Sequence, residues 1–248
     1  ANKSVSDFQL APDSWLTSID FNKVDRIAAT SNTNEIVLLN SNDLSVVSTH
    51  QPLTNTKATS NWIFADCRHS LQFTSQHSIM TSCRNEGIYH WNIDENLAIV
   101  IDEKERSITD ASLSAVAINT NHQQLIGAYD DHSIKIWTLP ALSDSQSIYY
   151  DYDTRLEVTA LATKGDKLYS VSHDRRELRV WSTDNQQHLK QMVNDKHQQQ
   201  FEGIALAKNA DVGITWDRLN EVQLWDLSTG KFQAAFQPDT SSVDIISA

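Results

Sequence analysis

Short runs of alternating apolar and polar residues recur along the whole chain. The clearest run lies at 221–230, where Val222 and Leu224 are separated by a glutamine and Trp225 follows directly. Runs of four to eight such residues, bounded by Asn, Ser, Asp or Thr, predict β-strands. No run approaches the roughly 18 apolar residues of a membrane-spanning helix. We therefore expect an all-β chain that does not insert into a membrane.

The run at 221–230 has four earlier copies, with Leu39, Trp91, Trp137 and Trp181 in the position of Trp225. The separations are 52 (39 to 91), 46 (91 to 137), 44 (137 to 181) and 44 (181 to 225) residues. A period of roughly 40–45 residues, with a strand that ends in Trp-Asp, is typical of a β-propeller blade. The predicted strands, four to a repeat, are 15–21, 26–31, 35–40 and 44–48; 71–74, 78–83, 87–92 and 97–101; 113–118, 124–129, 133–138 and 147–151; 156–162, 167–172, 177–182 and 189–193; 201–206, 212–216, 221–227 and 232–236.

The strand that carries the tryptophan is apolar on both faces. The residues three and one before the tryptophan, such as Leu178 and Val180, are aliphatic and point away from the tryptophan's own face. A two-sheet sandwich would leave one face of each strand polar. In a propeller, by contrast, each four-stranded sheet lies between two others, and both faces are covered.

The connections between the second and third strands carry a further mark, an aspartate at 131, 174 and 217. Together with Trp225 and Asp226, these residues resemble WD40 repeats. The resemblance implies one β-propeller domain over residues 1–248, built of four-stranded antiparallel blades, with five readable and six or seven when complete. It also implies a non-catalytic scaffold that docks peptide or protein segments on its top face as a subunit of a larger assembly. The Gly-His pair and the His–Asp network of the family are absent, so we expect less rigid blades.

Two strand-like segments lie outside the five repeats, at 3–10 and 242–247, and the second resembles the first strand of a sixth repeat. They would make a partial blade at each terminus. Three explanations stay open. The sequence is a fragment of a longer chain, or the ring is open and a partner completes it by strand addition, or the ring closes differently, for instance through 61–67.

Candidate protein-binding residues lie in the connections between second and third strands and in an insert at 51–70. Asp131, Arg175, Arg176 and Arg218 would lie on the top face, although pairing of the arginines with acids nearby is the plainer interpretation. Trp62 and Phe64, in the insert, would offer a second, hydrophobic contact. Trp216, which is extra to the repeat, is expected to pack in the core or at the rim, or else to be a binding aromatic.

Cysteine and histidine residues at 67, 69, 77, 83 and 90 suggest a zinc site, but their spacing fits no standard one. We expect Cys83 to be a small buried residue of a strand and His90 to be half-buried against polar neighbours. No metal or cofactor is therefore predicted. The alternative function is an enzyme or metal-binding propeller that gathers residues from several blades, which would leave no local motif.

The formal net charge is −12, from 32 acidic and 20 basic residues. Such a field repels phosphate backbones, so we expect protein partners with basic or neutral surfaces and no nucleic acid. Acidity is also a common means of staying soluble. Two cysteines make no disulfide framework, and residues 1–6 contain no apolar leader. We expect an intracellular protein, cytoplasmic or nuclear.

Overall fold

Every regular element that the computed structural model describes is a β-strand, which confirms the all-β prediction. Among these residues there is no helix long and apolar enough to cross a membrane. The described residues are 14, 16–31, 35–50, 71–83, 87–94, 97–100, 113–119, 123–129, 131–139, 145–149, 158–172, 177–196 and 199–237.

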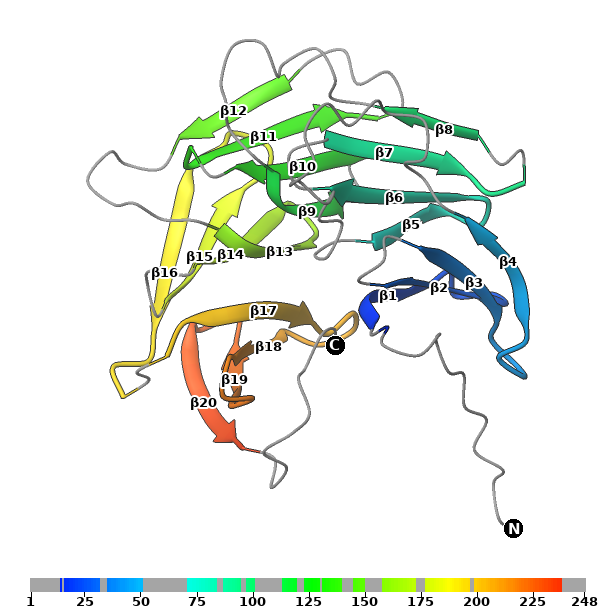
Figure 1. Ribbon diagram of the computed structural model, residues 1–248. Coiled ribbons are helices and arrows are strands. Elements are labelled where there is room, and N and C mark those ends of the chain that lie inside the picture. The colour runs from blue at the N-terminus through cyan, green and yellow to red at the C-terminus, as the bar shows by residue number, and fades with distance from the viewer. Residues whose placement is uncertain are drawn as a thin grey trace, which may run out of the picture. The chain divides into compact units, whose positions relative to one another are not determined.

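The strands form antiparallel sheets of four, each a simple meander of strands consecutive in sequence (Figure 1). The repeat boundaries read from the sequence coincide with these sheets. The bounds are β1 (Leu16–Phe21), β2 (Arg26–Ser31), β3 (Ile36–Asn40) and β4 (Val46–His50); β5 (Leu71–Ser75), β6 (Ser78–Cys83), β7 (Gly87–Asn92) and β8 (Leu97–Val100); β9 (Leu113–Asn119), β10 (Gln124–Tyr129), β11 (Ser133–Thr138) and β12 (Ser145–Tyr149); β13 (Val158–Lys164), β14 (Lys167–Ser172), β15 (Glu177–Ser182) and β16 (His188–Val193); β17 (Phe201–Leu206), β18 (Val212–Asp217), β19 (Val222–Asp226) and β20 (Lys231–Phe236).

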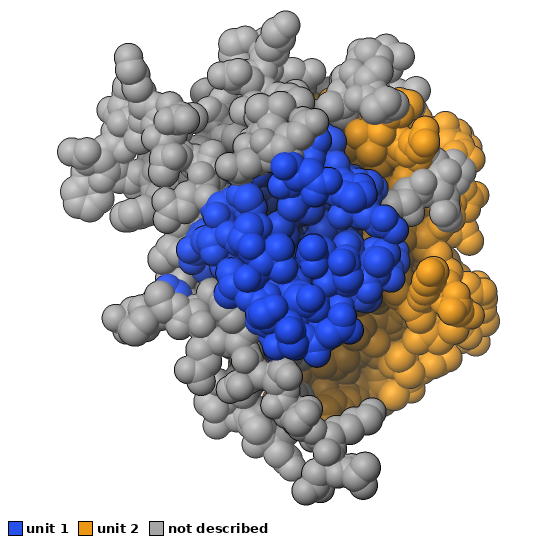
Figure 2. Space-filling view, turned by 90° about the vertical axis from the view of Figure 1, so that its right-hand side faces the viewer, with its two compact units in different colours: residues 1–110 blue, residues 111–248 orange. Residues whose placement is uncertain are grey.

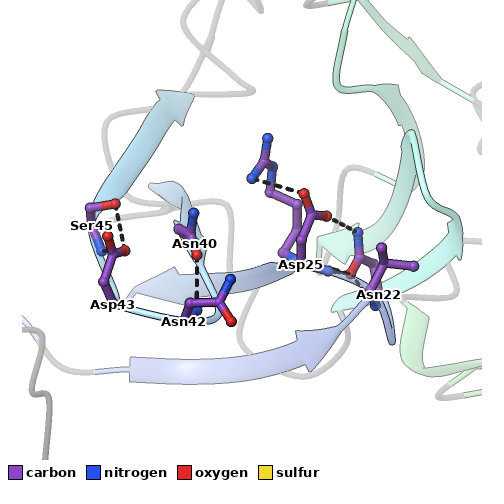
Figure 3. Close-up of polar contacts among 8 residues, drawn as sticks. Asn22, Asp25, Asn40, Asn42, Asp43 and Ser45 are labelled. Atoms are coloured by element: carbon purple, nitrogen blue, oxygen red, sulfur yellow. Dashed lines mark hydrogen bonds and ion pairs between the residues drawn. The ribbon is translucent and has the colours of Figure 1, made fainter.

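Turn chemistry explains why β4 begins two residues later than predicted. Asp43 Oδ1 accepts hydrogen bonds from the backbone N–H of Ser45 at 3.0 Å and from its hydroxyl at 2.7 Å (Figure 3). Leu44, between them, has a φ of 59°. A leucine in this left-handed region cannot continue a strand, so the turn extends to residue 45. The β1–β2 turn is closed similarly by Asn22, whose Oδ1 accepts from three backbone N–H groups at 2.9–3.0 Å.

The chain divides into two compact units, residues 1–110 and 111–248 (Figure 2). Unit 1 holds β1–β4 and β5–β8, and unit 2 holds the other three sheets. In unit 1, Ser18 Oγ accepts from the N–H of Leu71 at 3.3 Å, and Asp20 Oδ2 accepts from that of Phe73 at 2.7 Å. Both pairs are 53 residues apart, so β1 and β5 run side by side in the same direction.

The first strands of the three sheets in unit 2 are also neighbours that run in one direction. At their starts, the Thr159 hydroxyl of β13 donates to the Phe201 carbonyl of β17 at 2.8 Å. At their ends, the Thr163 hydroxyl donates to the Ile118 carbonyl of β9, also at 2.8 Å. Because each sheet is a meander, the connections between its second and third strands return to the end where its first strand begins. All three connections of this kind therefore lie at one end of unit 2.

Apolar side chains fill the space between consecutive sheets of unit 2. Leu178 and Val180 of β15, only 0% and 4% exposed, pack in one cluster with Phe201 and Trp225 of the next sheet. On the opposite face of β15, Trp181 packs in a second cluster with residues of β9–β11. The prediction that both faces of the tryptophan-bearing strand are covered is confirmed for this sheet.

Candidate functional site

The candidate site is the end of unit 2 that carries the connections β10–β11, β14–β15 and β18–β19. We call it the turn face. Its described residues lie in these connections, directly adjoin them in a strand or, like Glu202, lie near the start of a first strand. Those with a role below include Asp131, Glu177, Glu202, Asp217, Arg218, Leu219 and Glu221.

Asp217 fixes the backbone of the β18–β19 connection through hydrogen bonds to its carboxylate. Its carboxylate is buried, with 2% of the residue exposed, and Oδ1 accepts from the N–H groups of Leu219 at 2.8 Å and Glu221 at 2.9 Å. Asn220, at a φ of 61°, donates its own N–H to the Asp217 carbonyl at 3.0 Å. An aspartate that accepts bonds from its own turn fixes the backbone of that turn. Residues 218 and 219 are consequently held outward.

Arg218 and Leu219 are the exposed pair that this turn presents. The Arg218 side chain is 60% exposed and donates through Nε to Glu202 of β17, while Leu219 is 56% exposed. Pairing of the arginines with Asp174, Asp217 and Glu177 was the plainer interpretation of the sequence, and the structure adds Glu202, from the first strand of the sheet, as a partner of Arg218. Leu219 was not predicted. The sequence did contain a signal for Leu219. It is an aliphatic residue between Asp217 and Asn220, whereas the other connections between second and third strands contain polar residues at this point.

Asp131 is exposed and has a local role in the β10–β11 connection. Its Oδ1 accepts from the Ser133 N–H at 3.0 Å and from the Ser133 hydroxyl at 2.6 Å. His132, at a φ of 70°, donates its N–H to the Tyr129 carbonyl at 3.1 Å and closes the turn. Asp131 comes directly before the left-handed His132, as Leu219 comes directly before Asn220, so its place in the connection is that of Leu219 and its hydrogen bonds are made at the surface.

Glu177 opens β15 with a nearly buried ion pair. Its carboxylate accepts from Arg179 Nε at 2.5 Å and from the Gln191 amide of β16, and the two charged side chains are 6% and 14% exposed. The nearby ring of His188 packs edge-on against Trp181, with centroids 4.9 Å apart. Burial, with the Arg179 charge as a second cause, lowers the pKa of His188. Removing one charge from so buried a pair would leave the other uncompensated, which makes the pair a structural support for the turn face.

An amide network joins two sheets at this end, in the absence of the family's Gly-His pair. The Asn194 amide, after β16, donates to Gln223 Oε1 at 3.3 Å, and the Gln223 amide donates to Glu221 Oε1 at 2.8 Å. Gln223 is fully buried and Asn194 is 8% exposed. Satisfied buried amides fix the geometry of the groups they join. This network links the last two sheets through side chains.

Several predicted site residues lie outside the described ranges, and their positions stay predictions. These are Trp62, Phe64, Arg175 and Arg176. Trp216 is described and is 7% exposed, with its ring lying against Gly203, where a Cβ would approach Trp216 Cζ2 to 2.0 Å. Of the interpretations offered for Trp216, packing is the one that this burial favours.

The residues considered as zinc ligands are only partly described. Within the described ranges, no group of three or more His, Cys, Asp or Glu side chains could hold a metal ion, while Cys67 and His69 lie outside those ranges. His77 is paired with Asp94 at 2.7 Å on the surface. His90 is half-buried, its Nε2 lies 3.3 Å from the Thr74 hydroxyl, and burial lowers its pKa. This confirms the expected half-buried histidine with a polar neighbour.

No protein-family model matches this sequence, and no curated protein matched it either. The resemblance to WD40 repeats consequently depends on the quoted residues alone.

Proposed function

We propose that this chain is a WD40-like β-propeller that serves as a non-catalytic scaffold and docks peptide or protein segments on its turn face. One observation carries the proposal. The parallel first strands of unit 2 bring three connections to one end, where a buried aspartate holds Arg218 and Leu219 outward. A rigid frame beneath exposed contact residues is how loops commonly serve recognition.

The chemistry of the exposed pair suits a protein segment. Leu219 offers an apolar contact, and the Arg218 guanidinium is a charged donor group on an exposed side chain. Peptide carbonyls and carboxylates accept such donors, and arginine is enriched at protein interfaces. Arg175 and Arg176 would extend this surface along the β14–β15 connection, and Trp62 and Phe64 in the 51–70 insert would supply a second, hydrophobic contact.

The expected partners are proteins with neutral or basic surfaces, because the net charge of −12 disfavours nucleic acid. Two cysteines in 248 residues suit a reducing compartment, and we place the scaffold in the cytoplasm or nucleus as a subunit of a larger assembly.

The test compares three baits in an extract of the source cells, namely the wild-type chain, Arg218→Glu with Leu219→Asp, and a matched control. The control, Leu189→Asp with Lys208→Glu, makes the same kinds of change at exposed sites away from the turn face. Proteins captured by the wild type are quantified, purified and titrated against each bait. We expect the turn-face variant to weaken binding at least about tenfold and the control to leave it unchanged. Equal binding by both variants would refute the assignment of this face.

A further inference from the structure

The last sheet, β17–β20, has an apolar face that points away from β13–β16. Trp225 and Thr215 face β13–β16, so the residues that alternate with them face the other way. Cross-strand pairing places these residues on one surface, since Ile214 pairs with Leu224 and Val222 with Phe236. We call this surface the outer face; it consists of Ala205, Ile214, Trp216, Val222, Leu224, Ala234 and Phe236.

The outer face is less buried than the same positions in the sheets before it. Leu178 and Val180 of β15 are 0% and 4% exposed, because the next sheet covers them. Their counterparts Val222 and Leu224 are only half-buried, and Phe236 is 67% exposed. An apolar surface of this kind, on a sheet whose other face is packed, favours a further layer.

In the second and third sheets of unit 2, the first strand meets the preceding sheet through two apolar residues three positions apart. Val158 and Leu161 pack on β9–β12, and Phe201 and Ile204 pack on β13–β16. The same spacing recurs after β20, at Val243 and Ile246. The step from 158 to 201 is 43 residues, and that from 201 to 243 is 42. Val243 and Ile246 therefore repeat the apolar pair of β13 and of β17 at the next interval of the repeat.

Residues 237–242 are long enough to lead the chain from the end of β20 back to the position beside β17. From the end of β20, at Phe236, residues 237–242 lead to Val243. Six extended residues reach up to roughly 20 Å. The span from the fourth strand of a sheet back to its first is three strand spacings, about 14 Å. The preceding sheets make the same crossing with eight residues, 150–157, and seven, 194–200.

We propose that residues 243–247 form a strand beside β17, parallel to it, and cover the outer face with Val243 and Ile246. These two side chains contact the surface around Ile214 and Leu224, as Phe201 and Ile204 contact Tyr169 and Val180. Ile245, like Gly203 in β17, lies next to the inward-facing residue and points away. The inference follows from the sheet geometry of unit 2 and holds whether or not the turn face binds protein.

Adjacent isoleucines provide the matched test in the full-length chain. Hydrogen exchange of residues 243–247 is followed by mass spectrometry in the wild type, in Ile246→Asp and in Ile245→Asp. We expect wild-type exchange at least about tenfold slower than in a free peptide of residues 238–248. Ile246→Asp should abolish this protection and Ile245→Asp should keep most of it. Free-peptide exchange in the wild type, or loss of protection only in Ile245→Asp, would overturn the proposal.

A photoactivatable cross-linking residue at position 246 identifies what lies on the outer face, even if the aspartate variants fold poorly. Peptide mapping should find an intramolecular cross-link to 212–226. A cross-link to a second copy or to another protein would instead show that a partner's surface meets this segment, and would overturn the proposal. A cross-link to unit 1 alone would do the same.

Discussion

Asp131 and Asp217 both accept hydrogen bonds within their own connections but differ in burial, and the difference sets their contribution to stability. Asp217 is 2% exposed and its carboxylate accepts from two backbone N–H groups, whereas Asp131 is exposed. A buried donor left without an acceptor loses its hydration with no compensation. At the surface, water replaces the lost acceptor.

We predict that Asp217→Ala lowers the free energy of unfolding by about 1–3 kcal/mol. Asp131→Ala should change it by no more than about 0.5 kcal/mol. Urea titration followed by tryptophan fluorescence measures both variants. Equal losses would mean that burial does not distinguish the two turns.

Asp20 and Asp43 have pKa values shifted in opposite directions. Burial raises the pKa of Asp20, against the opposing hydrogen bond from the Phe73 N–H. Hydrogen bonds from the Ser45 N–H and hydroxyl lower the pKa of exposed Asp43. A raised folded-state pKa gives stability that is present at low pH and is lost as pH rises through that pKa. A lowered pKa gives stability that is present at neutral pH and is lost as pH falls.

We predict that Asp20→Asn becomes more stable relative to the wild type as the pH rises from about 4 to 7. The asparagine carbonyl still accepts from the Phe73 N–H and carries no charge to bury. Asp43→Asn should show the opposite trend, with its relative stability improving as the pH falls towards 3. Thermal unfolding across this pH range measures both. Parallel pH profiles for the two variants would contradict the assigned causes.

In three of the sheets, the strand beside the tryptophan-bearing strand has a hydroxyl residue at the position of Thr215. The Trp225 N–H donates to Thr215 Oγ1 at 2.9 Å, and the Trp181 N–H donates to Ser170 Oγ at 3.0 Å. Trp91 and Thr81 hold the corresponding positions in β7 and β6, yet their buried polar atoms have no hydrogen-bond partner among the described residues. Similar sequences thus give a satisfied pair in one sheet and an unsatisfied pair in another.

This difference predicts unequal effects of the same substitution. Thr215→Val should cost about 1–3 kcal/mol, because it leaves the buried Trp225 N–H unpaired. Thr81→Val should be neutral or stabilising, because it removes a buried hydroxyl that has no partner. Differential scanning calorimetry of the two variants gives the comparison. A cost for Thr81→Val as large as that for Thr215→Val would show that its hydroxyl is hydrogen-bonded in solution.

For the whole molecule, the proposed propeller requires both units to belong to one compact body. A compact chain of 248 residues has a radius of gyration of about 18 Å. We predict a value near this one from small-angle X-ray scattering at moderate salt, where the net charge of −12 is screened. Two units joined as independent bodies would give a distinctly larger radius and would contradict the single propeller.

Most of the architecture was predictable from local sequence. Alternating runs bounded by turn residues gave strands whose repeats match the observed sheets, because alternation and turn chemistry act within a few residues. The exceptions are also local. At Leu44 the apolar–polar alternation continues, but the left-handed backbone of this residue delays the start of the strand to Val46. Asp131 and Asp217 were recognisable for the same reason, since each accepts hydrogen bonds from its own connection.

Contacts between residues far apart in the sequence, within one sheet or between two, were decided only by the tertiary structure. Arg218 meets Glu202, sixteen residues away, and Asn194 meets Gln223, twenty-nine away. Leu219 is exposed although it is aliphatic, because the turn beneath it is fixed by a buried carboxylate. Periodicity determines which way a side chain points from its own strand. It does not determine which group from another sheet will face that side chain, since this depends on how the sheets stack.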